Sequence, residues 1–521
     1  MPPVHVAAPE RFASQTALAP RPQLQRQASP GLRLLGLTVL ALLVHGYHPY
    51  AEDAGIYVAG IKLRLHPELY PASAGFLRPY LGLSLFSNLN AWLVRGLHLR
   101  LETVLFAMQV GTTWLLLYSC LLLSRRCFAR SGSEAQWGAV TLVALCLTVP
   151  VAGSSLFLMD PYVTSRSIST PFTLLAVSAC LDRRLGRTLA CLAVVGVFHP
   201  LMGIYAAGLL LLLEAVKRRS GPGVGVGMGA LAAGALLLGA GVQFSQRHVV
   251  ETPAHHAAVL TRYYYFLSMW QWYEWVGLVA PLVLLMLYCR WRGFEGRRPD
   301  VMLAYASMAI GAIAIALCLL FARPTSASHL LATLQPMRSF LFVYYCMFLL
   351  LGGVLGQYWL KGIAWRWTLL VCGLSGTMYG FAQATYPALA QVELPWLESQ
   401  NPWAEAFLWV RIHTPVDATV ALDADYIQAK GEDAQGFRAI AERSSLADFS
   451  KDGGSAAIFP ALAGEWMVEH TADTGLSRMN DAERRQRMQP FGVHWLILRR
   501  TAATGLVCPF ANELVKVCRL A

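Results

Sequence analysis

The chain has 521 residues, of which 56% are hydrophobic and only 14% are charged, and its mean hydropathy is +0.46. Ordinary soluble domains carry about 25% charged residues, so this composition excludes a chain that mostly faces water. The formal charge of +12 does not indicate a nucleic-acid partner, because residues 389–521 hold 13 Lys and Arg against 17 Asp and Glu. The positive excess lies in short segments between apolar runs, as membrane topology requires. The predicted partner is therefore the lipid bilayer.

Residues 1–32 are rich in Pro, Ala, Gln and Arg without hydrophobic periodicity, so we expect a disordered cytoplasmic tail. The bulky segment His45–Tyr50 offers no signal-peptide cleavage site after the first apolar run, which predicts an uncleaved anchor. A membrane span needs roughly 20 apolar residues. Candidate spans lie near residues 33–49, 101–123, 136–157, 167–181, 224–243, 276–289, 301–321, 339–359 and 366–386.

A further apolar run, Leu189–Leu213, contains His199-Pro200 at its centre. Proline removes a backbone donor and disfavours helix in the residue before it, so two short helices are expected to meet there. If both cross the membrane, the basic clusters between spans all fall on one side. The positive-inside rule then places the N-terminus in the cytoplasm and residues 389–521 outside. The sequence thus predicts an α-helical polytopic protein of about eleven spans in a bacterial inner membrane, with a transmembrane domain over 33–388.

Two long segments are expected on the outer side. Residues 50–100 are too polar for a span but have helical apolar spacing, which favours helices along the membrane surface. Residues 245–275 contain the aromatic runs Tyr263–Phe266 and Trp270–Trp275. Such aromatic density is typical of the headgroup region. An interfacial belt and a groove for a lipid substrate both remain open for the second segment.

From Gln391 onward the composition becomes that of a soluble protein, which predicts a small periplasmic α/β domain over 389–521. Ala418–Leu422 and His494–Leu498 have the pattern of strands, and Val507–Arg519 that of a strand or hairpin. Glu432–Leu446 has helical character. Cys508 and Cys518 are the two cysteines of this domain. An oxidising compartment would allow them to form a disulfide, and the spacing alone leaves that open.

The strongest candidate site is the segment His48-Pro49-Tyr50-Ala51-Glu52-Asp53, at the outer end of the first span. The adjacent carboxylates of Glu52 and Asp53 suit a general base or a divalent-cation site. Such a base is expected to be tuned toward neutral pKa by desolvation and by its neighbour. The alternative is that Asp53 caps a helix that begins near Ala54. Both interpretations remain open, with His48 and Tyr50 as neighbouring substrate-binding candidates.

A second candidate cluster joins Asp160 and Arg166 at the outer mouth of the third and fourth spans. An arginine there can bind a phosphate through two parallel hydrogen bonds, or it can simply pair with Asp160 and brace a turn. Arg323, His329 and Arg338 form a third outer set that could meet an anionic lipid phosphate together, although each alone is typical of an interfacial anchor.

His199, at the tip of the broken pair, is either a polar residue that faces a cavity or a core histidine. Broken helices are found at transporter sites, so this residue does not separate an enzyme from a carrier. The sequence contains no Walker motif, dinucleotide glycine fingerprint or zinc-type Cys/His spacing. Glu52 and Asp53 are therefore the sole candidate metal ligands at this stage.

The layout resembles the GT-C membrane glycosyltransferases, which include oligosaccharyltransferases, protein mannosyltransferases and aminoarabinose transferases. The likeness comprises a short first span, an acidic pair on a long first outer loop, about ten more spans and an outer α/β domain. No Asp-x-Asp occurs in the first loop, and no Trp-Trp-Asp in the outer domain. The stretches that carry the resemblance are Tyr47–Ala54, Asp160–Ser167, Phe198–Met202, Gln335–Arg338, Asn401–Val420 and Phe437–Arg443.

The resemblance implies an enzyme that takes a sugar from a polyprenyl-phosphate carrier at the outer membrane face. The acceptor would be an envelope lipid, glycan or protein. Asp53 or Glu52 would be the catalytic or metal-binding carboxylate. Two other classes remain open: a transporter or flippase of a lipid-linked or small polar solute, and a non-catalytic scaffold for envelope polysaccharide assembly.

Overall fold

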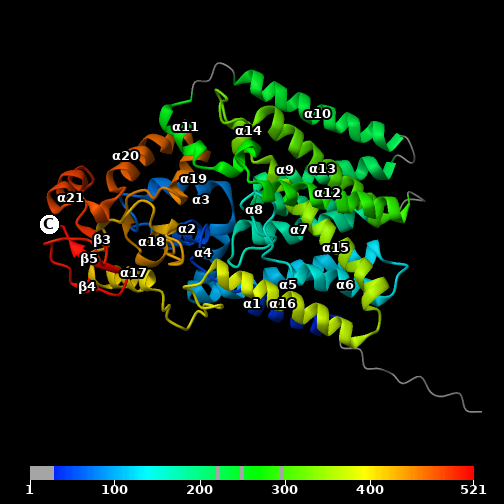
Figure 1. Cartoon of the computed structure of the whole chain (residues 1–521), viewed down its shortest axis with the longest axis horizontal. Helices are drawn as coiled ribbons and strands as arrows, with labels where there is room; N and C mark the ends of the chain where they lie inside the picture. Colours follow the sequence, from blue (N-terminus) through cyan, green and yellow to red (C-terminus); the bar gives the residue numbers. More distant parts are fainter. Residues whose placement is uncertain (1–28, 219–222, 247–250, 294–297, 521) are drawn as a thin grey trace, which may run out of the picture.

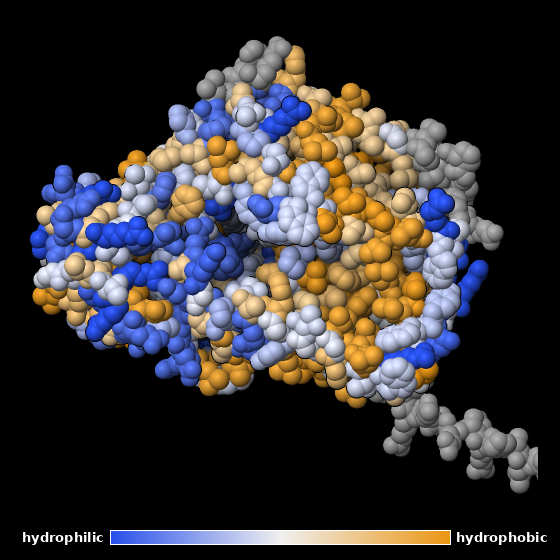
Figure 2. All heavy atoms as spheres, in the orientation of Figure 1, coloured by the Kyte–Doolittle hydropathy of each residue, from blue (hydrophilic) through white to orange (hydrophobic). Residues whose placement is uncertain are grey.

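The computed structural model describes residues 29–218, 223–246, 251–293 and 298–520. Long helices run side by side in one half of an elongated molecule, and the C-terminal sheet lies at the opposite end (Figure 1). On the face drawn in Figure 2, apolar side chains form a broad belt over the helical half, and hydrophilic side chains cover the sheet end and the far tip. An apolar belt between two polar ends is typical of a membrane-embedded helical domain.

The apolar runs identified in the sequence all contain helices. Within the described residues, six helices are long and apolar enough to cross a membrane, and the apolar helices Pro30–His45 and Leu185–Phe198 are shorter. The molecule is thus consistent with a multi-pass membrane protein. The helices of this half are α1 (Pro30–His45), α5 (Leu101–Cys127), α6 (Ser133–Ala144), α7 (Ser165–Leu181), α8 (Leu185–Phe198), α9 (Pro200–Arg218), α10 (Gly223–Ser245), α12 (Trp272–Arg292), α13 (Pro299–Phe321), α15 (Phe340–Leu355) and α16 (Ala364–Thr385).

The predicted span 136–157 is wrong beyond Ala144, where α6 ends. The following residues up to Thr164 form no helix. Pro150 lacks a backbone donor, and Ala152 and Ser155 have positive φ angles of 46° and 56°. This segment is largely buried, and Tyr345 donates a hydrogen bond of 2.7 Å to the carbonyl of Leu158. Irregular backbone is tolerated at membrane depth where protein surrounds it, and hydropathy alone does not distinguish it from helix.

The prediction that two helices meet at His199-Pro200 is confirmed. Lys217, near the end of α9, donates a hydrogen bond of 2.7 Å to the carbonyl of Cys180, which lies shortly before α8 begins. A Cβ on Gly203 would lie 3.0 Å from the Cα of Gly196, on the other side of the turn. The two helices therefore form a hairpin whose tip is His199.

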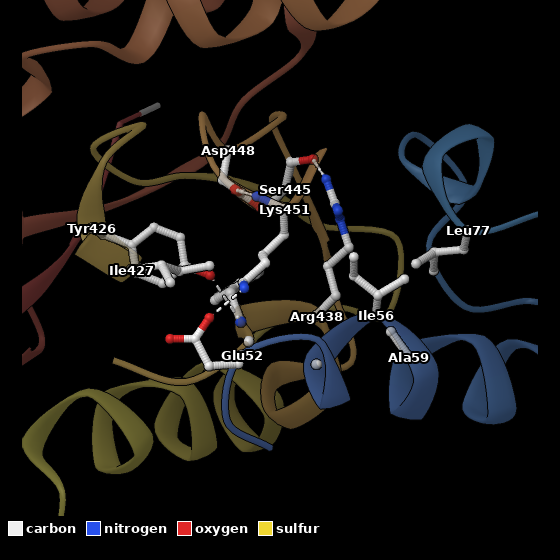
Figure 3. A pocket seen from close by; sticks show the side chains of 13 residues that line it. Glu52, Ile56, Ala59, Leu77, Tyr426, Ile427, Arg438, Ser445, Asp448 and Lys451 are labelled. Carbon is white, nitrogen blue, oxygen red and sulfur yellow. Dashed lines mark hydrogen bonds and ion pairs between the residues drawn. The ribbon is translucent and has the colours of Figure 1, made fainter. Parts of the chain in front are cut away.

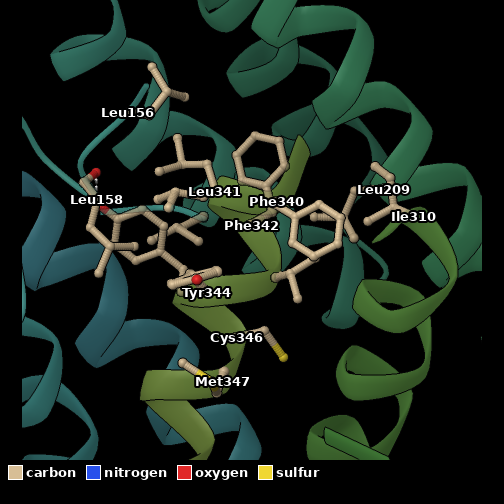
Figure 4. Packing of buried hydrophobic residues seen from close by; sticks show 14 of the residues in the cluster. Leu156, Leu158, Leu209, Ile310, Phe340, Leu341, Phe342, Tyr344, Cys346 and Met347 are labelled. Atoms are coloured by element: carbon tan, nitrogen blue, oxygen red, sulfur yellow. Dashed lines mark hydrogen bonds between the residues drawn. The ribbon is translucent and has the colours of Figure 1, made fainter. Parts of the chain in front are cut away.

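The packing between α6 and α15 depends on glycines. A Cβ on Gly138 would lie 2.5 Å from the carbonyl oxygen of Gly352, and one on Gly356 would lie 2.1 Å from that of Glu134. Small residues at such spacing let two helix backbones approach closely. In Figure 4 the aromatic and aliphatic side chains of α15, among them Phe340, Phe342 and Tyr344, extend toward the neighbouring helices.

The first outer loop folds into α2 (Ala54–Leu65), η1 (Ala74–Phe76), α3 (Arg78–Leu83) and α4 (Phe86–Leu97). In α4, Trp92 is 67% exposed while Phe86 is fully buried, an amphipathic pattern that fits the expected surface helix. By contrast, α2 lies beneath the C-terminal domain, residues 389–521, which we call the outer domain after its expected location, and a Cβ on Gly55 would approach the Cα of Gly436 to 2.9 Å. The expectation of surface helices is wrong for α2, which is largely buried in the protein, and it stays a prediction for α4.

The second outer segment contains α11 (Pro253–Leu260), η2 (Tyr263–Tyr265) and η3 (Leu267–Met269). Its aromatic residues divide into two groups. Tyr265, Phe266 and Trp270 are buried in the protein, whereas Trp272 and Tyr273 are 75% and 59% exposed. Only the exposed group suits an interfacial belt. The chain between α13 and α15 contains the short helices α14 (Leu330–Thr333) and η4 (Pro336–Ser339).

The C-terminal domain is a mixed α/β unit around a five-stranded sheet of order β2-β1-β3-β5-β4. Strands β1 (Thr419–Ala421) and β3 (Trp495–Arg499) confirm the two predicted strands, and β4 (Phe510–Ala511) with β5 (Val515–Arg519) confirms the hairpin. Of the predicted helix 432–446, only α18 (Phe437–Ala441) is helical. Cys508 and Cys518 are joined by a disulfide. The domain also contains α17 (Pro402–His413), β2 (Ser444–Ser445), α19 (Lys451–Ile458), α20 (Ala463–Asp473) and α21 (Asp481–Met488).

Candidate active site

Asp53 immediately precedes α2, yet its side chain makes no capping hydrogen bond to the helix. Asp53 therefore occupies the cap position before Ala54, as that alternative expected, but its side chain does not cap the helix. The preceding residue, Glu52, has a φ of 50°, a backbone conformation that non-glycine residues rarely adopt and that is often found at functional sites. This turn directs both carboxylates toward the outer domain.

Lys451, the first residue of α19, meets these two carboxylates. Its Nζ donates a hydrogen bond of 3.2 Å to Asp53 Oδ1 and another to Glu52 Oε2. Figure 3 shows Glu52 and Lys451 pointing toward one another across a pocket between α2 and the outer domain. The Asp53 side chain is 44% exposed whereas that of Lys451 is 14% exposed. The carboxylate is thus open to water while its cation is largely enclosed.

Two arginines also act on Asp53. The surrounding protein removes part of the water around Asp53, which alone would raise its pKa, but the positive charges of Lys451, Arg166 and Arg338 lower that pKa to about 2. The expectation of a carboxylate tuned toward neutral pKa is therefore wrong, because three cations outweigh desolvation. Asp53 is ionised at physiological pH. Asp53, Arg166 and Arg338 come from the three separate candidate clusters of the sequence, and in the structure the two arginines act on the Asp53 carboxylate.

Arg166 is the second residue of α7, and its guanidinium forms an ion pair with Asp160. Both side chains are buried, with 9% and 4% exposure. The predicted pairing of these two residues is confirmed. Since Arg166 also acts electrostatically on Asp53, the pair holds the arginine in place without removing it from the site.

Arg338 lies in η4, and its Nε is buried without a hydrogen-bond partner among the described residues. A guanidinium that lacks a carboxylate partner retains its capacity to bind an anion. His199, at the tip of the α8–α9 hairpin, lies within the electrostatic range of Arg338 and Arg166. Burial and these two arginines lower the pKa of His199 to about 3, so His199 is neutral at physiological pH. We call Asp53, Lys451, Arg166, Arg338 and His199 the Asp53 site.

Other predicted residues do not join the Asp53 site. His48 is buried, with Nδ1 3.3 Å from Glu393 Oε2, and its ring packs on Tyr386. Tyr50 donates a hydrogen bond of 3.1 Å to Glu102. Arg323 is exposed. His329 is held by Glu251, as described below.

Lys451 and two tyrosines near Asp53 were not among the predicted site residues. Tyr57 lies one helical turn after Asp53, and its hydroxyl is 3.1 Å from Ser165 Oγ, beside Arg166. Tyr80 lies 6.4 Å from Tyr57 between ring centroids, and its hydroxyl is 3.2 Å from Ser455 Oγ in the outer domain. The i, i+4 spacing of Asp53 and Tyr57 is a signal that could have identified Tyr57. No local signal in the sequence indicates Lys451.

The three cations that act on Asp53 can bind an anionic group, and the partly exposed carboxylate can act on a polar group next to that anion. Phosphate is one of the anions that guanidinium groups bind through two parallel hydrogen bonds. The predicted cation site between Glu52 and Asp53 stays a prediction, and a metal ion there would compete with the Lys451 ammonium. A scan of protein-family models finds no match to the chain, and a search of curated proteins finds no relative.

Proposed function

We propose that the chain is a membrane glycosyltransferase of the GT-C type. It would transfer a sugar from a polyprenyl-phosphate donor to an envelope acceptor at the outer face of a bacterial inner membrane. The observation that carries this proposal is the location of Asp53 on the first outer loop, within the electrostatic range of Arg166, Arg338 and Lys451. The neutralising partner of Arg166 is already present in Asp160, which leaves Arg338 as the arginine most available to the donor.

In this reaction the acceptor oxygen attacks the anomeric carbon, and the bond between that carbon and the phosphate oxygen breaks. The acceptor proton passes to Asp53, and the polyprenyl phosphate leaves with the bonding electron pair. A negative charge near a carboxylate raises its pKa. When a donor phosphate binds Arg338 and Arg166, it offsets the cations that keep Asp53 acidic. Donor binding would thereby make Asp53 a stronger base when one is required.

The proposed orientation has eleven crossings, a cytoplasmic N-terminus and a periplasmic outer domain. Several contacts support a common basic end of the helical half. Arg126, at the end of α5, pairs with Asp182 after α7, with a distance of 2.6 Å between Nε and Oδ1. Ser131 and Gln357 share a hydrogen bond of 3.1 Å at that end. The Cys508–Cys518 disulfide in the outer domain supports an oxidising compartment on the other side.

The alternative of a transporter rests on the α8–α9 hairpin and His199. A proton-coupled carrier would need a group that titrates near neutral pH, and the lowered pKa of His199 disfavours that role. The scaffold alternative keeps the same fold without transfer activity. Both alternatives are outcomes of the experiment below.

The test is mass spectrometry of polyprenyl-linked sugars and surface glycans in a deletion strain that carries wild type, Asp53→Asn or Glu68→Gln. Glu68 is the matched control, because it lies on the same loop and its side chain is 62% exposed. The proposal expects donor lipid to accumulate and one sugar to disappear with Asp53→Asn, while wild type and Glu68→Gln restore both. Full rescue by Asp53→Asn would remove the proposed base. An unchanged glycan profile in the deletion strain would favour transport or a scaffold.

A further inference from the structure

A cluster of metal-ligating side chains lies on the outer face, apart from the Asp53 site. Glu251 precedes α11, His255 and His256 lie in its first turns, and His329 directly precedes α14. Glu251 Oε2 lies 2.8 Å from His329 Nδ1 and 3.6 Å from His255 Nδ1. The side chains of Glu251 and His329 are 9% and 0% exposed. A buried carboxylate surrounded by histidines requires a proton or a metal ion to balance its charge.

The hydrogen bonds of the histidines decide which nitrogen faces the carboxylate. His329 Nε2 lies 3.2 Å from the carbonyl oxygen of Pro324, and His255 Nε2 lies 3.2 Å from that of Ala457. A carbonyl oxygen only accepts, so Nε2 carries the hydrogen in both rings. In the neutral form, each Nδ1 then presents a lone pair toward Glu251. Histidines that bind metals are held in this way, with the other ring N–H donated to a carbonyl.

We propose that Glu251, His256 and His329 bind one divalent cation of the zinc type. Their ligand atoms all lie within 4.8 Å of one another, and the His256 and His329 rings are 5.0 Å apart. Bonds of about 2.1 Å to a tetrahedral zinc ion place ligand atoms about 3.4 Å apart. The described side chains reach that geometry with small adjustments. Imidazole with one carboxylate favours zinc and similar transition metals over magnesium, which prefers oxygen ligands and bound water.

The cation would join two separate segments of the outer face, and a neighbouring hydrogen bond links them to a third. Glu251 and His256 belong to the segment around α11, and His329 leads through α14 into η4, which carries Arg338. His255, beside the cluster, connects to Ala457 in α19 of the outer domain. The metal would therefore stabilise the outer side of the molecule. This inference concerns a site of its own and does not depend on the proposed transferase activity.

The test uses the purified full-length protein in detergent, stripped with a chelator and then dialysed against zinc chloride. Wild type should retain about one zinc ion per chain, measured by inductively coupled plasma mass spectrometry. His256→Gln and Glu251→Gln should each reduce that content at least tenfold. His66→Gln is the matched control, because it removes an exposed histidine that also pairs with a glutamate, Glu68, and it should retain the wild-type zinc content.

A second measurement does not depend on the variants folding. Zinc should raise the thermal unfolding temperature of stripped wild type, since a ligand that binds the native state stabilises it, and magnesium at equal concentration should not. The proposal is overturned if stripped wild type takes up no zinc and gains no thermal stability. It is equally overturned if well-folded His256→Gln retains as much zinc as wild type. The first result would leave the cluster as a hydrogen-bonded contact between Glu251 and His329, and the second would remove His256 from the ligands.

Discussion

Lys451 donates a hydrogen bond of 3.2 Å to Asp53 Oδ1, although 398 residues separate them along the chain. This bond joins the outer domain to the first outer loop at the residue on which the proposed chemistry depends. Lys451 is also one of the three cations that keep the pKa of Asp53 low.

Replacing Lys451 by Met should raise the pKa of Asp53 from about 2 toward the ordinary range of about 4. Since a carboxylate acts as a base only when ionised, the acidic limb of the rate of sugar transfer should move to higher pH. The measurement is the pH profile of transfer in membranes between pH 3.5 and 7, in which Lys451→Met should lose activity at the acidic end while wild type, with its limb below this range, should not. Lys451→Arg should retain the wild-type limb, and so should Lys430→Met at an exposed position of the same domain. An acidic limb that stays unchanged in Lys451→Met would show that Lys451 does not lower the pKa of Asp53.

Loss of Arg338 should mainly weaken donor binding, whereas loss of Arg166 should mainly destabilise the fold. Arg338 has a guanidinium Nε without a described partner, so Arg338→Gln should weaken donor binding, seen as a KM raised at least tenfold, with little change in stability. Arg166→Gln leaves Asp160 buried and unpaired, which should destabilise the fold by about 3–5 kcal/mol. Thermal unfolding in detergent and donor titrations measure the two effects. A stability loss as large in Arg338→Gln as in Arg166→Gln would contradict the difference.

Gly353→Ala should destabilise the helical half strongly. The added Cβ would lie 2.0 Å from the ring of Phe128, and overpacking of this kind costs about 1–3 kcal/mol or more. Gly376→Ala in α16 is the matched control, because a Cβ there has nothing within 4 Å. The control should be neutral or slightly stabilising, since alanine favours helix. Equal unfolding temperatures of the two variants would show that α15 has room beside Phe128.

The Cys508–Cys518 disulfide closes a loop of 10 residues in sequence. Its loss should cost the outer domain about 2–3 kcal/mol. The double variant Cys508→Ser with Cys518→Ser should therefore be cleaved sooner in limited proteolysis of the outer domain. Cys372→Ser, which removes an exposed free cysteine, should behave as wild type. Alkylation of Cys508 and Cys518 in the unreduced wild-type protein would show that the disulfide does not form in the cell.

Glu469 should make the outer domain less stable as the pH rises. Burial raises the pKa of Glu469 to about 7, although the Ala447 amide that donates to it lowers that value. The folded state thus holds a proton that the unfolded state releases near pH 4.5. The resulting stabilisation is complete below that pH and disappears as the pH rises through about 7.

Glu469→Gln should remove that dependence. At about 1.4 kcal/mol per pKa unit, the variant should gain up to about 3 kcal/mol on wild type between pH 5 and pH 8. Thermal unfolding of both proteins across this range measures the difference. Glu465→Gln, an exposed position on the same helix, is the control. A constant difference between Glu469→Gln and wild type at every pH would contradict the raised pKa.

The sequence predicted those helices and turns that depend on nearby residues alone. Apolar runs predict buried helices because hydrophobic burial depends on composition, and Pro200 reveals the turn between α8 and α9 because proline disrupts helix wherever it occurs. The end of α6 at Ala144 escaped prediction for a physical reason. The irregular segment that follows is as apolar as a helix, and hydropathy measures burial rather than backbone conformation.

The Asp53 site was predictable only in part. Arg166 and Arg338 stand out because arginine is costly near a membrane. Lys451 is an ordinary lysine in a soluble domain, and only the folded chain brings it to Asp53. The same holds for Glu251 and His329, which are 78 residues apart in sequence and match no spacing motif.

The contact of Gly55 with Gly436 has a consequence for how the molecule can move. The two backbones touch with no side chain between them, and Gly55 lies two residues after Asp53. A hinge between them would need free space, and two backbones packed this closely leave none. The outer domain and α2 are therefore expected to move together as one rigid unit. Any opening of the site would then occur between this unit and the segments that carry Arg166 and Arg338.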